Sequence, residues 1–162
     1  MITGESVNQA CTAVGEFTDD EMAREFERFF REQRSICDFV IELTQESDQK
    51  IQELALFLSY MIFKAMEAGN SGTMSCVTPD ALEAAYRESE FWIERISQSE
   101  GGELKTAVAD SLQTDTEPHL LKYVISEING PLEDGTELDD EEKGEVFFVL
   151  KTVISSFGSR AG

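Results

Sequence analysis

His119 is the only histidine of the chain, so it is the first residue to consider for proton transfer or metal binding. A di-iron helical bundle needs a Glu three residues before such a histidine, and Thr116 stands at that position. Zinc sites usually draw on several His or Cys ligands, and the sequence indicates no Ser, Cys or Asp partner for a catalytic histidine. We therefore expect His119 to lie on the surface, without a catalytic role.

Pairs of carboxylates at a spacing of three are the next candidates, because that spacing places two acids on one helix face. Glu16 with Asp19, and Asp80 with Glu83, have the spacing found in helical magnesium sites. Both pairs fall at predicted helix starts, where acids are favoured by the helix dipole without any metal. We accordingly predict no catalytic residue, no metal site and no bound cofactor.

The three cysteines, Cys11, Cys37 and Cys76, are widely separated and form no CxxC motif. An odd number of cysteines argues against a closed set of disulfides. The first residues lack the basic and apolar segments of a signal peptide, and the apolar run from Leu54 to Met66 is shorter than the roughly 20 residues of a membrane span. Together these features predict a cytoplasmic protein that does not bind membranes.

The charge balance is strongly acidic, with 33 Asp and Glu against 13 Lys and Arg, a formal net charge of -20. Such a field repels nucleic acids and anionic lipids and attracts basic proteins. The densest acidic segment, 131–145, holds eight acids and one lysine and lacks the ligand order of a calcium loop. We expect a solvated loop or a docking site for a basic partner, with candidate contacts at Glu133, Asp134, Glu137, Asp139, Asp140 and Glu141.

Basic residues gather in one stripe, formed by Arg24, Arg28 and Arg31, with Arg34 close by. Acids within one helical turn accompany the first three, which predicts a self-paired surface. The alternative is an anion site or a contact with an acidic segment of another subunit.

Two aromatic residues, Phe91 and Phe148, point away from the apolar faces of their predicted helices. Aromatic residues are enriched in the cores of interfaces, so both are candidate contact residues. The simplest partner is a second copy of the chain, since two-fold homodimers are the commonest assemblies. The alternative is that another layer of the same domain covers them.

Helical periodicity and capping residues along the chain predict an all-α single domain of five or six helices, mostly with antiparallel neighbours. We expect residues 1–17 to form a flexible arm, 18–158 to form the helical domain and 159–162 to form a disordered tail. The expected helices cover about 18–45 with Gln33 as a break in the apolar face, 48–68, 78–97, 103–113, 116–130 and 139–158.

The helix over 48–68 is apolar nearly all round, which is typical of a central helix. Its polar stripe, Tyr60, Lys64 and Glu67, contains the first residues to suspect in a pocket inside the bundle. Two functions follow as hypotheses. The first is a non-enzymatic interaction protein: an adaptor, a cognate inhibitor or a chaperone-like binder of a basic protein. The alternative is a small enzyme or small-molecule binder that uses such a pocket.

Overall fold

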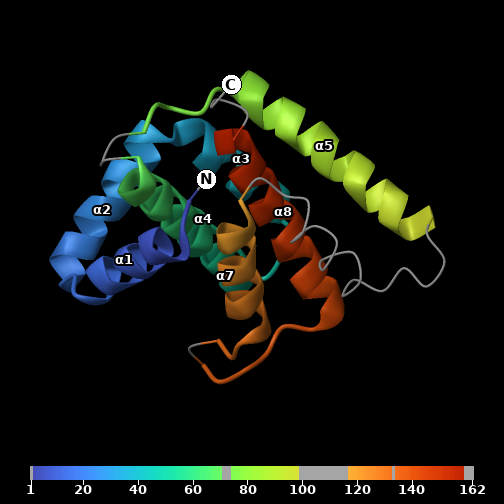
Figure 1. The fold of residues 1–162 in the computed structure, drawn as a ribbon. Helices are drawn as coiled ribbons and strands as arrows, with labels where there is room; N and C mark the ends of the chain where they lie inside the picture. Colours follow the sequence, from blue (N-terminus) through green and yellow to red (C-terminus); the bar gives the residue numbers. More distant parts are fainter. Residues whose placement is uncertain (1, 71–73, 99–116, 133, 159–162) are drawn as a thin grey trace.

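The computed structural model describes residues 2–70, 74–98, 117–132 and 134–158, and in these ranges the chain is all-α (Figure 1). The predicted fold class is therefore confirmed, whereas the number of helices is larger than the expected five or six. The predicted helix over 103–113 and the tail 159–162 lie outside the described residues. The helices are α1 (Gly4–Gly15), α2 (Asp19–Glu32), α3 (Arg34–Thr44), α4 (Gln49–Gly69), α5 (Pro79–Gln98), α7 (Pro118–Asn129) and α8 (Asp140–Gly158).

Side-chain caps fix the starts of three helices at the positions that the sequence predicted. Thr18 and Glu21 form both hydrogen bonds of a capping box at α2. The Thr78 hydroxyl accepts from the Ala81 N–H at 3.1 Å at the start of α5. At α8, the Glu142 N–H donates to Asp139 at 2.8 Å, and Glu142 accepts from the Asp139 N–H at 3.0 Å. These bonds satisfy amides that have no partner within the helix.

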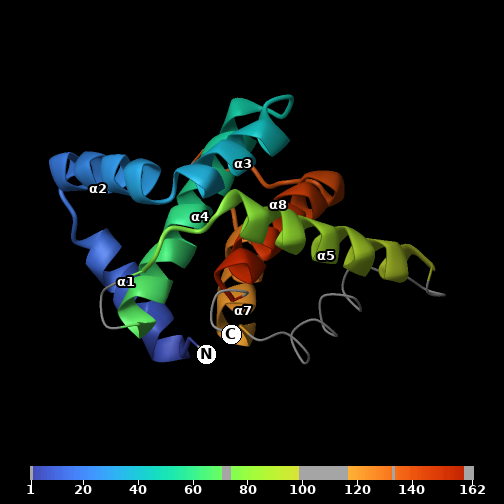
Figure 2. The same ribbon diagram turned by 90° about the horizontal axis from the view of Figure 1, so that it is seen from above.

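The first predicted helix is divided in two at Gln33, which has φ -125° and ψ 48°. Its side chain is fully buried and binds the segment that precedes α5. The amide Nε2 donates to the Ser75 carbonyl at 3.0 Å, and Oε1 accepts from the Val77 N–H at 2.9 Å. The bend at Gln33 lets α2 and α3 run in different directions (Figure 2).

Residues 4–15 form a helix, which corrects the expectation of a flexible arm over residues 1–17. Thr3 caps α1 by accepting from the Ser6 N–H at 3.1 Å. Val7 and Ala10 are buried, and Cys11 and Val14 pack against the core from the same face. The apolar face of α1 consists of small residues, so its apolar signal in the sequence is weak. The spacing of three and four residues along this face is nevertheless helical.

The segment before α1 is anchored as well. Ile2 is buried, and its N–H donates to the buried Glu117 carboxylate at 2.8 Å. A Cβ on Gly69, at the end of α4, would lie 2.3 Å from Ile2 Cδ1. Glycine at this position therefore lets the start of the chain approach the end of α4 closely.

Two helices form the centre of the fold. As the sequence predicted, α4 is one of them: it contacts α1, α2, α3, α7 and α8, and Leu58, Ile62 and Phe63 are fully buried. The other is α8, which contacts α3, α4, α5 and α7 and lies between α5 and α7 (Figure 1). No described helix, α4 included, is long and apolar enough to cross a membrane.

Helix α5 lies on the outside, against α8 and α3. In both views its carboxyl-terminal end extends past the other labelled helices (Figures 1 and 2). Leu82, Ala85 and Ser89 are buried on its inner face, but Ile93, which follows on the same face, is 40% exposed. Ile93 continues the spacing of the inner face, but it lies toward the carboxyl-terminal end of α5, where the helix extends past the other labelled helices.

Candidate functional site

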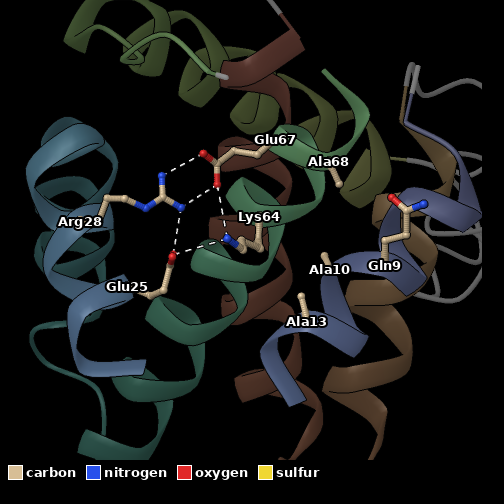
Figure 3. A pocket seen from close by; sticks show the side chains of 8 residues that line it. All are labelled: Gln9, Ala10, Ala13, Glu25, Arg28, Lys64, Glu67 and Ala68. Carbon is tan, nitrogen blue, oxygen red and sulfur yellow. Dashed lines mark hydrogen bonds and ion pairs between the residues drawn. The ribbon is translucent and has the colours of Figure 1, made fainter. Parts of the chain in front are cut away.

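An open pocket of about 530 Å³ lies between α1, α2 and α4 (Figure 3). One wall carries charged side chains from α2 and α4, and the other carries small side chains from α1 and the end of α4. The residues that line it are Gln9, Ala10, Ala13, Glu25, Arg28, Lys64, Glu67 and Ala68.

Arg28 is the centre of the charged wall. Its two terminal nitrogens donate to the two oxygens of Glu67 at 2.9 and 2.7 Å, and Nη2 also donates to Glu25 Oε2 at 2.9 Å. The guanidinium lies 5.1 Å from the centroid of the Phe63 ring, which adds a cation–π contact. This bidentate pairing ties α2 to α4, because planar guanidinium groups match carboxylates in geometry as well as charge.

Tyr60 and Glu25 extend the network into the core. Tyr60 is fully buried, and its hydroxyl donates to Glu25 Oε2 at 3.1 Å. Burial and the negative charge of Glu25 raise the pKa of Tyr60. Burial also works against the Glu25 carboxylate, but hydrogen bonds from Arg28 and Tyr60 and the charges of Arg28 and Lys64 outweigh it and lower the pKa of Glu25.

The Arg28 guanidinium is likewise held in its charged form. The hydrogen bond to Glu67 is the largest influence and raises the pKa of Arg28, with Glu25 adding to it against the effect of burial. Tyr60 and Arg28 therefore stay protonated and Glu25 stays ionised at neutral pH. Three fixed protonation states suit the binding of a ligand better than the transfer of a proton.

Lys64 differs from Arg28 in how it is satisfied. Its Nζ lies 3.6 Å from Glu25 Oε2 and 3.9 Å from Glu67 Oε1, which are ion-pair distances but too long for hydrogen bonds. The ammonium also lies 5.6 Å from the centroid of the Phe17 ring. Lys64 thus brings a positive charge to the pocket while its N–H groups keep their capacity to donate.

Helical spacing explains why these charges share one wall. Glu25 and Arg28 are three residues apart on α2, and Lys64 and Glu67 are three apart on α4, so each pair lies on one helix face. The structure brings together Tyr60, Lys64 and Glu67, the residues of the predicted polar stripe. Glu25 and Arg28 could not be predicted to join them, because a pairing across helices leaves no local signal in the sequence beyond the Arg28 stripe.

The other arginines of that stripe have separate surroundings. Arg24 and Arg31 are exposed, and Arg34 Nε lies 3.7 Å from Asp38 Oδ2. The predicted pairing with an acid one turn away is found at Arg28, which contacts Glu25 at 2.9 Å, although its closest partner, Glu67, belongs to another helix.

The two aromatic candidates have different environments. Phe91 is 62% exposed on the outer side of α5. Phe148 is half-buried within the fold, because its ring meets Tyr86 of α5 edge-on at 5.5 Å between centroids. For Phe148 the alternative interpretation, that another layer of the same domain covers it, therefore holds, since α8 is central and α5 covers the side that carries Phe148.

The acidic candidates lie around the start of α8, and Glu133 lies outside the described residues. The other five, Asp134, Glu137, Asp139, Asp140 and Glu141, are exposed. Two have local roles: Asp134 accepts from the Thr136 N–H at 3.0 Å and hydroxyl at 2.6 Å, and Asp139 caps α8. They are spread over a turn and a helix start and do not join the pocket.

His119 is exposed, as the sequence predicted. The three described cysteines are in the thiol form, not in disulfides: Cys37 is buried, Cys11 is half-buried and Cys76 is exposed. Within the described ranges, no three His, Cys, Asp or Glu side chains gather closely enough to hold a metal ion.

Comparison of the chain with models of protein families, with curated proteins and with solved structures found no match.

Proposed function

We propose that the protein is a non-enzymatic interaction protein that binds a basic segment of another protein through the last turns of α5. The observation that carries this proposal is the 62% exposure of Phe91, the largest among the big apolar side chains on the described surface. Exposure of a large aromatic ring to water is unfavourable. Covering the ring with a partner lowers the free energy and so stabilises the complex.

The surroundings of Phe91 define the chemistry of that partner. Glu88 and Glu94 lie one turn before and after it on the same side of α5, and both are exposed. One neighbouring cation, Arg87, is paired with Glu83 at 2.6 Å. An apolar centre with acids around it is complementary to an amphipathic segment whose polar face carries lysine or arginine.

A second copy of the chain is the alternative occupant, in the homodimer that the exposed aromatics suggested. A two-fold dimer through this face would bring Glu88 of one copy near the acids of the other, and two chains at -20 repel each other. Salt screens such repulsion beyond about 8 Å at physiological ionic strength. A dimer therefore tightens as salt rises, whereas the complex with a basic segment weakens.

Binding of a labelled amphipathic helical peptide of leucine and lysine, followed by fluorescence anisotropy at low and high salt, tests the proposal. We expect Phe91→Ser to weaken binding about tenfold or more, since burying one phenylalanine contributes on the order of 2 kcal/mol. Phe30→Ser is the matched control, because Phe30 is 38% exposed on α2 and should leave binding unchanged.

Equal binding by the parent and Phe91→Ser would contradict the proposal. Sedimentation of the free protein at the same two salt concentrations distinguishes the alternative: association that increases with salt and is lost in Phe91→Ser would assign the face to a homodimer. A cytoplasmic location agrees with the proposal, since three cysteines outside disulfides suit a reducing compartment.

A further inference from the structure

The pocket between α1, α2 and α4 is separate from the outer face of α5 and has a chemistry of its own. Its charged wall holds two cations, Arg28 and Lys64, and two carboxylates, Glu25 and Glu67, so its formal charge is zero in a chain of net charge -20. Glu32, 3.5 Å from Arg28 and outside the lining, adds one more carboxylate, and this nearly balanced charge disfavours two ligand classes. A simple anion would meet Glu25 and Glu67, and a simple cation would meet Arg28 and Lys64.

The hydrogen-bonding capacity of the four groups is not used equally. Arg28 engages both oxygens of Glu67 and Oε2 of Glu25, so Arg28 and Glu67 largely satisfy each other. Lys64, by contrast, lies beyond hydrogen-bond distance of its two carboxylates. The contacts of Glu25 with Arg28, Tyr60 and Lys64 all involve Oε2, which leaves Oε1 as an acceptor on the same wall.

The unused donor and the unused acceptor carry opposite charges and lie next to each other, since Lys64 Nζ is 3.6 Å from the Glu25 carboxylate. A ligand that fits both must present a carboxylate to Lys64 and an ammonium to Glu25 with little separation between them. An α-amino acid has these two groups on one carbon atom.

The opposite wall indicates where the rest of such a ligand would lie. Ala10, Ala13 and Ala68 present methyl groups across the pocket from the charges (Figure 3). Small apolar side chains leave room and offer apolar contact, and the volume of about 530 Å³ is within the usual range for small-molecule sites. Gln9 stands beside them with an amide that can donate and accept.

From these features we infer that the pocket binds a small zwitterion, namely an α-amino acid with an aliphatic side chain. Its carboxylate binds Lys64, its ammonium binds Glu25, and its side chain packs against the alanines of α1. Arg28 and Glu67 are positioning residues, since their mutual bonds hold Lys64 and Glu25 in place.

Titration of the full chain with alanine, valine and leucine, followed by amide chemical shifts and by melting temperature, tests this inference. Each amino acid is compared with the amine that lacks its carboxylate and with the acid that lacks its ammonium. We expect one or more of the amino acids to bind with a dissociation constant of about 10 mM or tighter. Neither the amine nor the acid should bind comparably, because each engages only one of the two charged groups, Lys64 or Glu25.

Two variants locate the site. Lys64→Met removes the donor, and Ala13→Leu fills the apolar side without touching the charges; each should weaken binding at least tenfold. Lys122→Met is the matched control, because Lys122 is exposed on α7 and should bind as the parent does. Circular dichroism confirms that each variant is folded.

Three results would overturn the inference: no amino acid binds, the amine or the acid binds equally well, or Ala13→Leu retains full affinity. None of these bears on the α5 surface, because Phe91 and the pocket lie on different helices.

Discussion

Val77 and Gln33 are 44 residues apart in the sequence, yet the buried N–H of Val77 donates to the Gln33 side chain at 2.9 Å. The side-chain amide of Gln33 also donates to the Ser75 carbonyl through Nε2. One side chain therefore both donates to and accepts from the backbone before α5, as a neighbouring β-strand would. Gln33 thus joins the bend between α2 and α3 to the start of α5.

We expect Gln33→Leu to lower the free energy of unfolding by about 1–3 kcal/mol. Leucine fills a similar volume but offers no acceptor, which leaves the Val77 N–H buried without a partner. Gln49→Leu on the exposed side of α4 is the control and should change stability by about 0.5 kcal/mol or less. Urea denaturation measures both, and an equal loss in the two variants would show that the buried amide is not important.

Helix α1 should contribute substantially to stability. Val7→Asp places a charge at a buried position and should lower the free energy of unfolding by about 2 kcal/mol or more. Asn8→Asp introduces the same charge one residue later, at an exposed position of the same helix, and should be nearly neutral. If thermal melts show the two variants to be equally stable, α1 does not dock as described.

The pH dependence of stability should carry the signature of Glu25. Its pKa in the folded protein lies below the ordinary value of 4.5, so the unfolded chain binds more protons in mild acid. The stability from ionised Glu25 is therefore complete above the unfolded pKa and is lost as the pH falls through the lower folded pKa.

We expect the melting temperature of Glu25→Gln to fall less steeply than that of the parent between about pH 5 and pH 3. Glu53→Gln, on the exposed side of α4, should follow the slope of the parent. Parallel curves for the parent and Glu25→Gln would mean that the carboxylate is not stabilised by Arg28 and Lys64.

Thiol reactivity should separate the cysteines. Burial, with a smaller contribution from the charge of Asp38, raises the pKa of Cys37 to about 12, so little thiolate is present to react. At about pH 8 we expect a disulfide reagent to modify the exposed Cys76 rapidly and Cys37 only after unfolding. Cys76→Ser should remove the fast phase, and rapid modification of Cys37 in the folded protein would contradict the prediction.

Local features of the fold could be predicted from the sequence, because caps and apolar periodicity act over a few residues. Thr18, Thr78 and Asp139 begin their helices as expected, and α4 is central because apolar side chains lie on nearly all of its sides. Helix α1 was missed because its buried face is made of small residues, whose apolar signal is weak even at helical spacing.

Relationships between helices could not be predicted in the same way. The burial of Phe148 depends on α5 crossing α8, which the sequence of α8 does not encode locally. Similarly, the polar stripe of α4 indicated Lys64 and Glu67, but the partners on α2 depend on how the two helices pack. The exposure of Phe91 was visible from the sequence because it needs only the orientation of one helix.

The connections of α2 to the rest of the fold have a consequence for local opening. Among the described side chains of α2, only Phe29 is fully buried. The Arg28–Glu67 pair supplies the closest polar bond between α2 and α4. Segments with few buried contacts open at lower free energy than the whole protein. Amide hydrogens of α2 should therefore exchange with solvent through a partial unfolding in which the helix swings away about Gln33, while those of α4 and α8 exchange only on global unfolding.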